Sequence, residues 1–342
     1  IDEALAEQET PLKPPGQLAE NDDPNFRRWW ERNVRPQRQE GYSVVTIALP
    51  LGDITPRQLR DLADIARRFC KETIRATVEQ NLVVRWVAND ELPALHTALH
   101  AAHLATPGAS SITDIVSCPG TDTCKLGISS SRGLAAELHN RLTARSAEMD
   151  AAVENLHIKV SGCFNSCGQH HIADLGFYGV TRKIAGFQVP HFQVVLGGEW
   201  NNNAGAYGLP VVAIPSRNIP QVVDRLTERY VQERQSDEGF RAWVARIGKT
   251  AVKTLLADLA KPPEDPAFFV DWGDSRQYST GDMGVGECAG EVVPLVEFTL
   301  TAAERAVFEA QVALDKGAVD EARTTAFQAM VTAAKALVST EA

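Results

Sequence analysis

Four cysteines in two short loops constrain this chain more than any other feature of its sequence. They form a C-x5-C pair, Cys118 and Cys124, and a C-x3-C pair, Cys163 and Cys167, with 38 residues between the pairs. The loops read S-C-P-G-T-D-T-C-K and S-G-C-F-N-S-C-G-Q, so small and turn-forming residues surround the sulfurs. Such residues allow a close backbone approach and leave N–H groups free to bond thiolates. The pattern predicts a metal or iron–sulfur centre.

Three kinds of site compete for these cysteines. A disulfide framework fits poorly, because six cysteines in 342 residues are sparse and no secretory segment is visible. A structural zinc site usually separates its paired ligands by two to four residues, so a spacing of five fits poorly. An iron–sulfur cluster tolerates wider spacing, because the ligands reach four iron corners and not one ion. Spacing alone favours the cluster modestly and leaves zinc open.

The context of the loops adds a family resemblance. Together with the upstream segment R-A-T-V-E-Q-N at 75–81, they closely resemble the sirohaem and [4Fe-4S] nitrite and sulfite reductases, from about Phe26 to about Gly248. The resemblance implies that the cluster ligands are Cys118, Cys124, Cys163 and Cys167, and that Cys167 also bridges the cluster to the sirohaem iron. It further implies that the residues near the sirohaem include Arg75, Thr77, Gln80, Asn81, Asn165 and Gln169.

The same resemblance implies an oxidoreductase that takes six electrons from a donor such as ferredoxin and reduces nitrite to ammonium. We prefer nitrite because sulfite reductases more often have Arg where Gln169 stands. Reduction of sulfite to sulfide is the first alternative. A cluster-binding electron-transfer module without turnover of its own is the second. The sequence assigns no catalytic residue.

The chain resembles only the second of the two related halves found in full-length members of this family. It has one R-x-T segment and both cysteine pairs, whereas most basic residues that face the substrate belong to the first half. It also opens on Ile1 and runs through an acidic stretch that contains prolines. We therefore expect further sequence upstream, and an N-terminal half as a partner.

Composition limits the other partners. The net charge of −10 and the pI near 5.4 argue against nucleic acid as the main partner. The longest apolar runs, such as 211–214, are far too short to span a bilayer. A reducing, cytoplasmic location is the default expectation, and it suits an oxidation-sensitive cluster.

Hydrophobic periodicity predicts an α+β fold. With what the resemblance implies, it gives four parts: a linker (1–25), a ferredoxin-like half-domain (26–111), a sirohaem and [4Fe-4S] domain (112–260), and a linker with a helical extension (261–342). In the half-domain we expect strands at 42–49 and within 74–87, and helices at 55–69 and 90–104. In the next domain we expect strands at 112–116, 158–161, 172–180 and 191–196, and helices at 125–147, 219–233 and 238–247. The extension should form two helices at 301–338, broken near Gly317.

Two other features have simpler explanations. His96, His100 and His103 are spaced so that they could share a helix face, but exposed helix histidines are commoner than metal ligands. Cys70 ends an apolar helix and is most simply a small buried residue.

Overall fold

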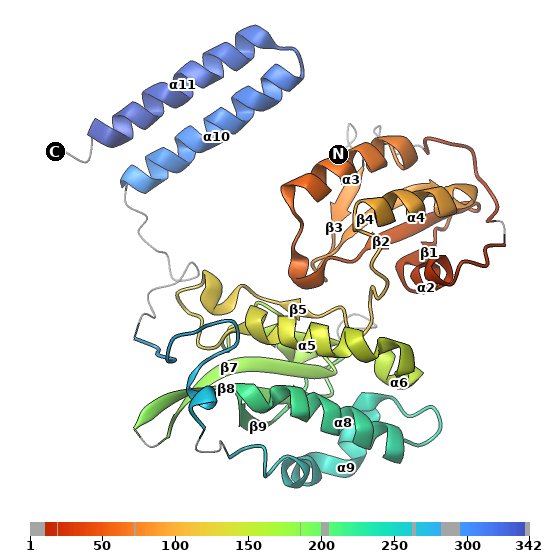
Figure 1. Cartoon of the computed structure of the whole chain (residues 1–342), viewed down its shortest axis with the longest axis vertical. Helices are drawn as coiled ribbons and strands as arrows, with labels where there is room; N and C mark the ends of the chain where they lie inside the picture. Colours follow the sequence, from red (N-terminus) through yellow and green to blue (C-terminus); the bar gives the residue numbers. More distant parts are fainter. Residues whose placement is uncertain are drawn as a thin grey trace. The chain divides into compact units, whose positions relative to one another are not determined.

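The computed structural model describes residues 11–18, 20–71, 73–184, 186–199, 205–261, 265–281 and 295–338. The chain divides into two compact units, Ile1–Gly284 and Val285–Ala342 (Figure 1). The first unit contains two sheets with different strand orders, and each sheet carries its own helices. The α+β class is confirmed.

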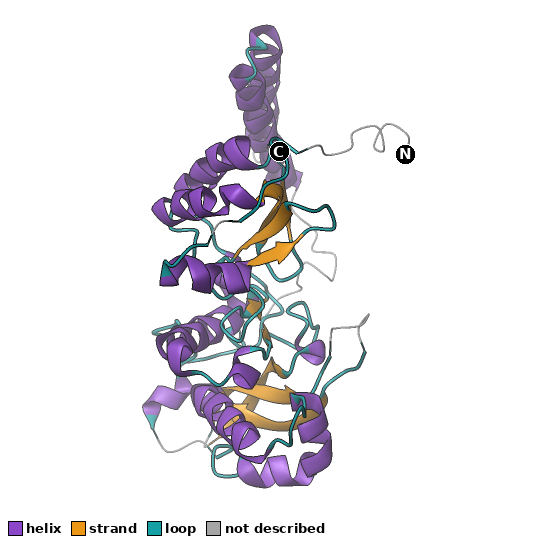
Figure 2. Cartoon of the chain, turned by 90° about the vertical axis from the view of Figure 1, so that its right-hand side faces the viewer, coloured by secondary structure: helices purple, strands orange, loops and turns teal. Residues whose placement is uncertain are grey.

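The first domain is an antiparallel sheet with helices on one side (Figure 2). Its strand order is β1-β2-β4-β3. The strands are β1 (Val34–Pro36), β2 (Tyr42–Ile47), β3 (Ile74–Ala76) and β4 (Leu82–Ala88). The helices are α2 (Pro24–Asn33), α3 (Pro56–Phe69) and α4 (Leu92–Ala101). The expected strands and helices of this domain are present, whereas α2 and β1 were not predicted.

Helix α3 was predicted correctly because residues close together in sequence determine where it starts. Thr55 caps the helix, its side chain accepts a hydrogen bond from the Gln58 N–H, and Pro56 occupies the first turn. Leu62 and Phe69 lie on the buried face, and the helix ends at Phe69 as expected. The predicted start and end of this helix are confirmed.

The second domain is a mixed sheet with strand order β5-β6-β7-β8-β9. The strands are β5 (Val116–Ser117), β6 (Ile158–Ser161), β7 (Leu175–Ile184), β8 (Phe187–Leu196) and β9 (Leu209–Pro215). The first two pairings are parallel and the last two are antiparallel. The helices are α5 (Ser131–Arg145), α6 (Ala151–Glu154), α8 (Ile219–Glu233) and α9 (Phe240–Leu255). Phe177, Phe192 and Trp243 are fully buried in its core.

Several elements of this domain differ from the expectation. The strand expected at 172–180 is β7 at Leu175–Ile184, the strand expected at 191–196 begins at Phe187 as β8, and the helix expected at 238–247 continues to Leu255 as α9. The strand predicted at 112–116 shrinks to β5, because a turn at 111–114 precedes it. The helix predicted to start near 125 begins only at Ser131, where Ser130 caps it. Strand β9 was missed, although its apolar core at 211–214 is visible in the sequence.

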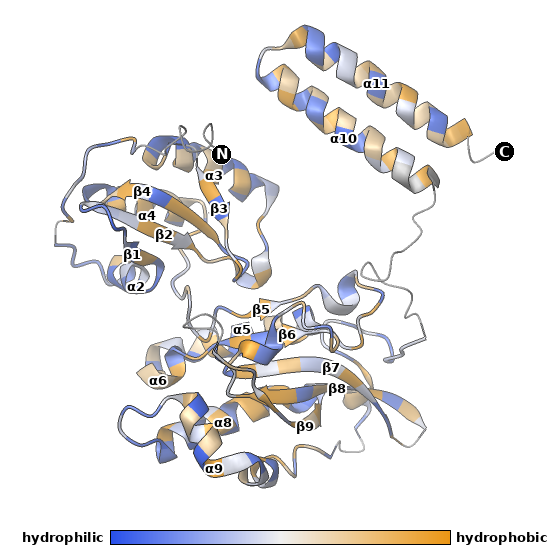
Figure 3. Ribbon diagram, turned by 180° about the vertical axis from the view of Figure 1, so that it is seen from behind, coloured by the Kyte–Doolittle hydropathy of each residue, from blue (hydrophilic) through white to orange (hydrophobic). Residues whose placement is uncertain are grey.

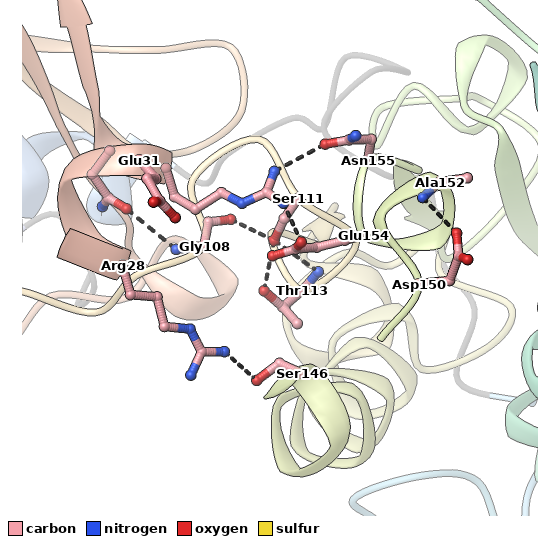
Figure 4. A network of polar contacts seen from close by, with 12 residues as sticks. Arg28, Glu31, Gly108, Ser111, Thr113, Ser146, Asp150, Ala152, Glu154 and Asn155 are labelled. Atoms are coloured by element: carbon pink, nitrogen blue, oxygen red, sulfur yellow. Dashed lines mark hydrogen bonds and ion pairs between the residues drawn. The ribbon is translucent and has the colours of Figure 1, made fainter. Parts of the chain in front are cut away.

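Polar contacts tie α2 of the first domain to the second domain (Figure 4). The Arg28 guanidinium donates to the Ser146 hydroxyl at 2.6 Å. Arg32 donates to the Asn155 side chain at 2.9 Å and forms an ion pair with Glu154. Helix α2 therefore fastens the two domains as well as covering its own sheet.

The second unit is a helical hairpin of α10 (Leu295–Asp315) and α11 (Val319–Val338), joined by a turn in which Gly317 has a φ of +77°. The predicted break near Gly317 is confirmed. A seam of buried alanines lies between the helices, made by Ala303, Ala310, Ala313, Ala322, Ala329 and Ala336. Hydrophobic residues also lie outside this seam, among them the exposed Phe308 and Phe327 (Figure 3). In the part of the chain that the structure describes, no helix is long and apolar enough to cross a membrane.

Candidate functional site

The two cysteine loops leave the second sheet at the same edge. Cys118 follows β5 directly, and Cys163 lies two residues after the end of β6. The strands are parallel neighbours, with Ser117 opposite Val160. Because parallel strands end at a common edge, the sheet brings the loops together although 38 residues separate them in sequence.

Glycines let the two loops touch backbone to backbone. A Cβ on Gly162 would lie 2.7 Å from the Gly120 Cα, and a Cβ on Gly127 would lie 2.7 Å from the Gly120 carbonyl carbon. The N–H groups of Ile128 and Ser129 donate to the Gly162 carbonyl at 2.8 and 3.0 Å. A side chain at Gly162 would force the two loops apart, and one at Gly127 would clash with the backbone of the first loop itself. The sequence shows small residues in these loops, and the close backbone contacts in the structure explain why they are small.

The sulfurs differ in exposure. Cys118 and Cys163 are buried, Cys124 is half-buried and Cys167 is exposed, and all the described cysteines are free thiols. The Gly162 N–H donates to the Cys118 sulfur at 3.1 Å. The Ser131 hydroxyl lies 3.4 Å from this sulfur and donates to the Cys118 carbonyl at 2.8 Å. Hydrogen bonds to sulfur are typical of iron–sulfur ligands and tune the potential of the cluster.

No compact site for a single metal ion exists among the described residues: nowhere do three His, Cys, Asp or Glu side chains gather closely enough. This observation covers both the cysteine loops and the histidines of α4. Zinc would need its ligands within about 2.3 Å of one point. The ligands of a cluster reach separate iron corners, so a cluster needs its sulfurs farther apart than zinc does. Cluster ligation by the four cysteines stays a prediction.

The segment at 75–81, upstream of the loops, forms hydrogen bonds with the start of the first loop. Residues 77–81 form the turn between β3 and β4, where the Asn81 N–H donates to the Thr77 hydroxyl at 3.2 Å. The Gln80 side chain donates to the Ser117 carbonyl at 2.8 Å and accepts from the Ser117 N–H at 3.0 Å. Gln80 therefore holds the residue immediately before Cys118.

Both polar ends of the Asn81 side chain form hydrogen bonds within the protein. Its side-chain oxygen accepts from the Leu49 N–H at 2.8 Å, and its amide nitrogen donates to both oxygens of Asp114, at 2.9 and 3.1 Å. Burial is the main cause that raises the pKa of Asp114. Both amides of the Gln80–Asn81 pair thus bond protein groups, while Arg75 on β3 is exposed. Their contact with sirohaem stays a prediction.

A buried cation that sequence reasoning missed lies on β6 and bonds the end of the second loop. Lys159 on β6 is only 2% exposed, and its ammonium donates to the Gln169 side-chain oxygen at 3.0 Å. Burial lowers the pKa of Lys159. A lysine inside the apolar strand I-K-V-S was the available signal, since a buried charge needs a partner. Asn165, in the same loop, is exposed.

His170 lies directly behind this loop. Its Nδ1 lies 2.9 Å from the Ser161 hydroxyl, and burial lowers its pKa to about 4. It is therefore a neutral imidazole at pH 7 and packs next to the Tyr178 ring, with 4.7 Å between centroids. Its neighbour His171 packs edge-on against Tyr207.

Comparison with known proteins agrees with this architecture. Residues 35–102 match the nitrite/sulfite reductase ferredoxin-like half domain, and residues 108–261 match the nitrite and sulphite reductase 4Fe-4S domain. The chain belongs to the nitrite and sulfite reductase family. Membership in this family of oxidoreductases implies sirohaem and a [4Fe-4S] cluster as cofactors.

The proteins similar to this chain include some named nitrite reductases and others named sulfite reductases. The chloroplastic ferredoxin–nitrite reductase of Zea mays is 31% identical over 223 residues, which cover 62% of this chain and 38% of the relative. Sulfite reductase [ferredoxin] 1 of Mycolicibacterium paratuberculosis is 30% identical over 222 residues, covering 63% and 39%. The NirA structure from Mycobacterium tuberculosis aligns with a TM-score of 0.55 and 28% identity, over 70% of this chain and 43% of that one. The chain thus spans about two fifths of the length of the curated relatives it matches.

Proposed function

We propose that this chain carries the cluster and the sirohaem-ligating cysteine of an enzyme that reduces nitrite to ammonium with six electrons. The observation that carries the proposal is the backbone contact of the two cysteine loops, with the Gly162 N–H bonded to the Cys118 sulfur. The proposed cluster ligands are Cys118, Cys124, Cys163 and Cys167. When bound, the cluster relays single electrons and the sirohaem iron binds the anion.

The residues around the loops take different parts in this proposal. In this proposal the buried Cys118 and Cys163 anchor the ligand set at the edge of the sheet, and Cys167 is shared with the sirohaem iron; the exposure of Cys167 supports the second assignment. Gln80 and Asn81 hold the first loop in position through Ser117 and Asp114. We assign the rim of the sirohaem site to Arg75, Thr77, Gln80, Asn81, Asn165 and Gln169.

We also propose that a companion N-terminal half completes the enzyme. One ferredoxin-like half domain and one 4Fe-4S domain are present, and the match spans 38% of the maize relative. The companion would supply the basic groups that face the anion and donate protons to its oxygens. Ferredoxin is the proposed electron donor, since relatives carry it in their names. The proposed location is cytoplasmic.

Nitrite is preferred to sulfite because position 169 is Gln and not Arg. Arg offers a charged, bidentate fork that suits a doubly charged oxyanion, whereas an amide suits a smaller, singly charged anion. Sulfite reduction is the alternative, since similar proteins include named sulfite reductases. An electron-transfer module without turnover is the other alternative.

The test is reconstitution of the chain together with its companion half under anaerobic conditions. Cys167→Ser should remove the cluster absorption and alter the porphyrin bands together. Cys70→Ser is the matched control, because Cys70 is buried and burial raises its pKa to about 11. Equal effects of the two substitutions would contradict the ligand assignment. Broad iron–sulfur absorption without porphyrin bands would support the electron-transfer module, and a comparison of ferredoxin-linked turnover of nitrite and sulfite decides the substrate.

A further inference from the structure

Residues 265–281, which follow the matched 4Fe-4S domain, fold back onto that domain. We call this segment the strap. It begins with a short turn of helix, Pro266–Phe269, that packs beside β8, and it appears in blue in Figure 1. Its position is noteworthy because the family match ends at residue 261. The strap therefore adds contacts that the matched domain does not contain.

A buried carboxylate joins the strap to the start of α5. Asp271 is 6% exposed, and its side chain accepts from the Ser130 N–H at 2.8 Å and from the Ser216 hydroxyl at 2.8 Å. Ser130 is the N-cap of α5, so this carboxylate lies at the positive end of the helix. Burial raises the pKa of Asp271, whereas the hydrogen bonds from Ser130, Ser216 and Trp272 and the charge of Arg217 act in the opposite direction. Hydrogen bonds that a charged carboxylate accepts are stronger than neutral ones.

Several hydrogen bonds and one cation–π contact hold the strap against the domain. Arg217 donates to the carbonyls of Val270 and Asp271 at 3.1 Å each, and its guanidinium lies 4.2 Å from the Trp272 ring centroid. Further along, the Tyr278 hydroxyl donates to the Ile128 carbonyl at 2.6 Å. The strap therefore bonds the segment between the first cysteine loop and α5 at two points, Ile128 and Ser130.

Short chains of hydrogen bonds connect both residues to Cys118. Ser131, next to Ser130, donates to the Cys118 carbonyl at 2.8 Å and contacts the Cys118 sulfur. Ile128 donates to the Gly162 carbonyl, and the Gly162 N–H bonds the Cys118 sulfur. A cavity of about 780 Å³ lies between the strap and this loop, and Cys124 lines it together with Trp272 and Tyr278.

We propose that the strap positions the first cysteine loop and controls solvent access to it, with Asp271 and Tyr278 as positioning residues. Asp271 acts through Ser130 and Ser131 on Cys118, and Tyr278 acts through Ile128. The inference rests on the proposed function in so far as Cys118 and Cys124 are cluster ligands. Hydrogen bonding to sulfur and solvent exposure are two of the factors that set a cluster's reduction potential, and the strap governs both.

The first arm of the test uses the full chain without cofactor. Asp271→Ala should speed the alkylation of Cys118 and Cys124 by iodoacetamide about tenfold, followed residue by residue by mass spectrometry, because a charge-assisted bond that closes the loop is lost. Asp274→Asn is the matched control, since Asp274 lies in the same strap and its side chain bonds only strap residues in the contacts described, Ser275 and Arg276. Its alkylation rates should equal those of the unchanged chain.

The second arm uses the chain after cluster reconstitution. Asp271→Ala and Tyr278→Phe should each shift the reduction potential of the cluster and hasten its loss in air, whereas Asp274→Asn should do neither. Unchanged potential and unchanged alkylation in both positioning variants would overturn the proposal. If Asp271→Ala lowers the helical circular dichroism, Tyr278→Phe alone decides, because it deletes a single hydroxyl.

The two arms separate this inference from the proposed function. A chain that assembles no cluster even with its companion half, yet shows faster alkylation in Asp271→Ala, would refute the proposed function and support the positioning of the loop. A chain that assembles a cluster whose reduction potential and stability in air do not change in Asp271→Ala and Tyr278→Phe would support the proposed function and refute the proposed role of the strap.

Discussion

The ammonium of Lys159 donates to the side-chain oxygen of Gln169 at 3.0 Å and so links β6 to the end of the second cysteine loop. Lys159 is 2% exposed, and burial lowers its pKa, while Glu79 and Asp114 act in the opposite direction. Gln169 thus supplies a neutral acceptor to a buried cation. The residue on which the choice between nitrite and sulfite depends is also a structural partner of that cation.

The first prediction follows from this pair. Gln169→Arg should lower the free energy of unfolding by about 1–3 kcal/mol, because the hydrogen bond from Lys159 to residue 169 is lost and a second cation is placed beside Lys159. Gln169→Glu keeps an acceptor and should cost less. Urea denaturation measures both variants. Lys159→Met in the Gln169→Arg background should recover part of the loss, and full additivity of the two changes would contradict the coupling.

The second prediction concerns specificity in the complete enzyme. If Gln169 borders the anion site, Gln169→Arg should raise the ratio of kcat/KM for sulfite to kcat/KM for nitrite, because Arg adds charge and a bidentate fork. Steady-state kinetics with both anions measures the ratio, and cofactor content is checked by absorption. An unchanged ratio with intact cofactors would remove the physical argument for nitrite.

The third prediction concerns the backbone contact between the cysteine loops. Gly162→Ala places a Cβ 2.7 Å from the Gly120 Cα, so it should destabilise the domain by about 2 kcal/mol and reduce cluster content after reconstitution. Gly239→Ala is the control, because a Cβ there meets no atom within 4 Å. Thermal unfolding and iron analysis compare the variants. Equal iron content in both would argue against the close approach.

The fourth prediction concerns pH. His96 packs against the rings of Phe26 and Trp29, at 5.5 and 4.9 Å between centroids. Burial is the main cause that lowers its pKa below 6.5, with His100 acting in the same direction and Asp23 against it. The unfolded chain therefore binds this proton more readily, so stability should be lost as pH falls from about 6.5 through the folded pKa.

His96→Phe should flatten this loss, since the folded and unfolded states then no longer differ in proton uptake at this site. Urea denaturation between pH 7.5 and pH 5 measures the effect. His103→Asn is the control, because His103 is exposed and has a φ of +56°, which Asn tolerates. A pH dependence that survives His96→Phe unchanged would assign it to other groups.

The fifth prediction concerns the helical hairpin. Ala329→Glu buries a charge in the alanine seam, where Ala329 is 2% exposed, and should open α10 from α11. Hydrogen exchange of the α11 amides in the full chain should become much faster. Ala326→Glu, on an exposed position of the same helix, should leave the exchange rates unchanged.

The sequence predicted those parts of the fold that short-range chemistry determines. Thr55, Pro56 and Gln58 specify the start of α3 among themselves, and the prediction there is correct. The start of α5 was misplaced although the Ser130 hydroxyl caps the helix locally by accepting from the Gly133 N–H; the second bond at this cap, from the Ser130 N–H to Asp271, spans 141 residues and has no local signal. Strand β9 was missed because prolines open and close it, which favours a loop when it is read locally.

The candidate site divides in the same way. Spacing predicted the four cysteines as ligands, because ligand spacing is a local property, and their ligation stays a prediction. The clamp of Gln80 on Ser117 spans 37 residues and crosses from one domain to the next, so no local pattern announces it. Glycine at 120 and 162 was visible as a turn signal, whereas the contact between the two required the parallel pairing of β5 and β6.

The separation of Asp271 from Ser130 along the chain also has a consequence for biosynthesis. Ribosomes add about 5–20 residues per second, so 141 residues take roughly 7–30 s to emerge. During that interval the first cysteine loop exists without the strap that will cover it. Translation speed therefore sets a period in which iron and sulfide can reach the nascent loop from the side that later closes.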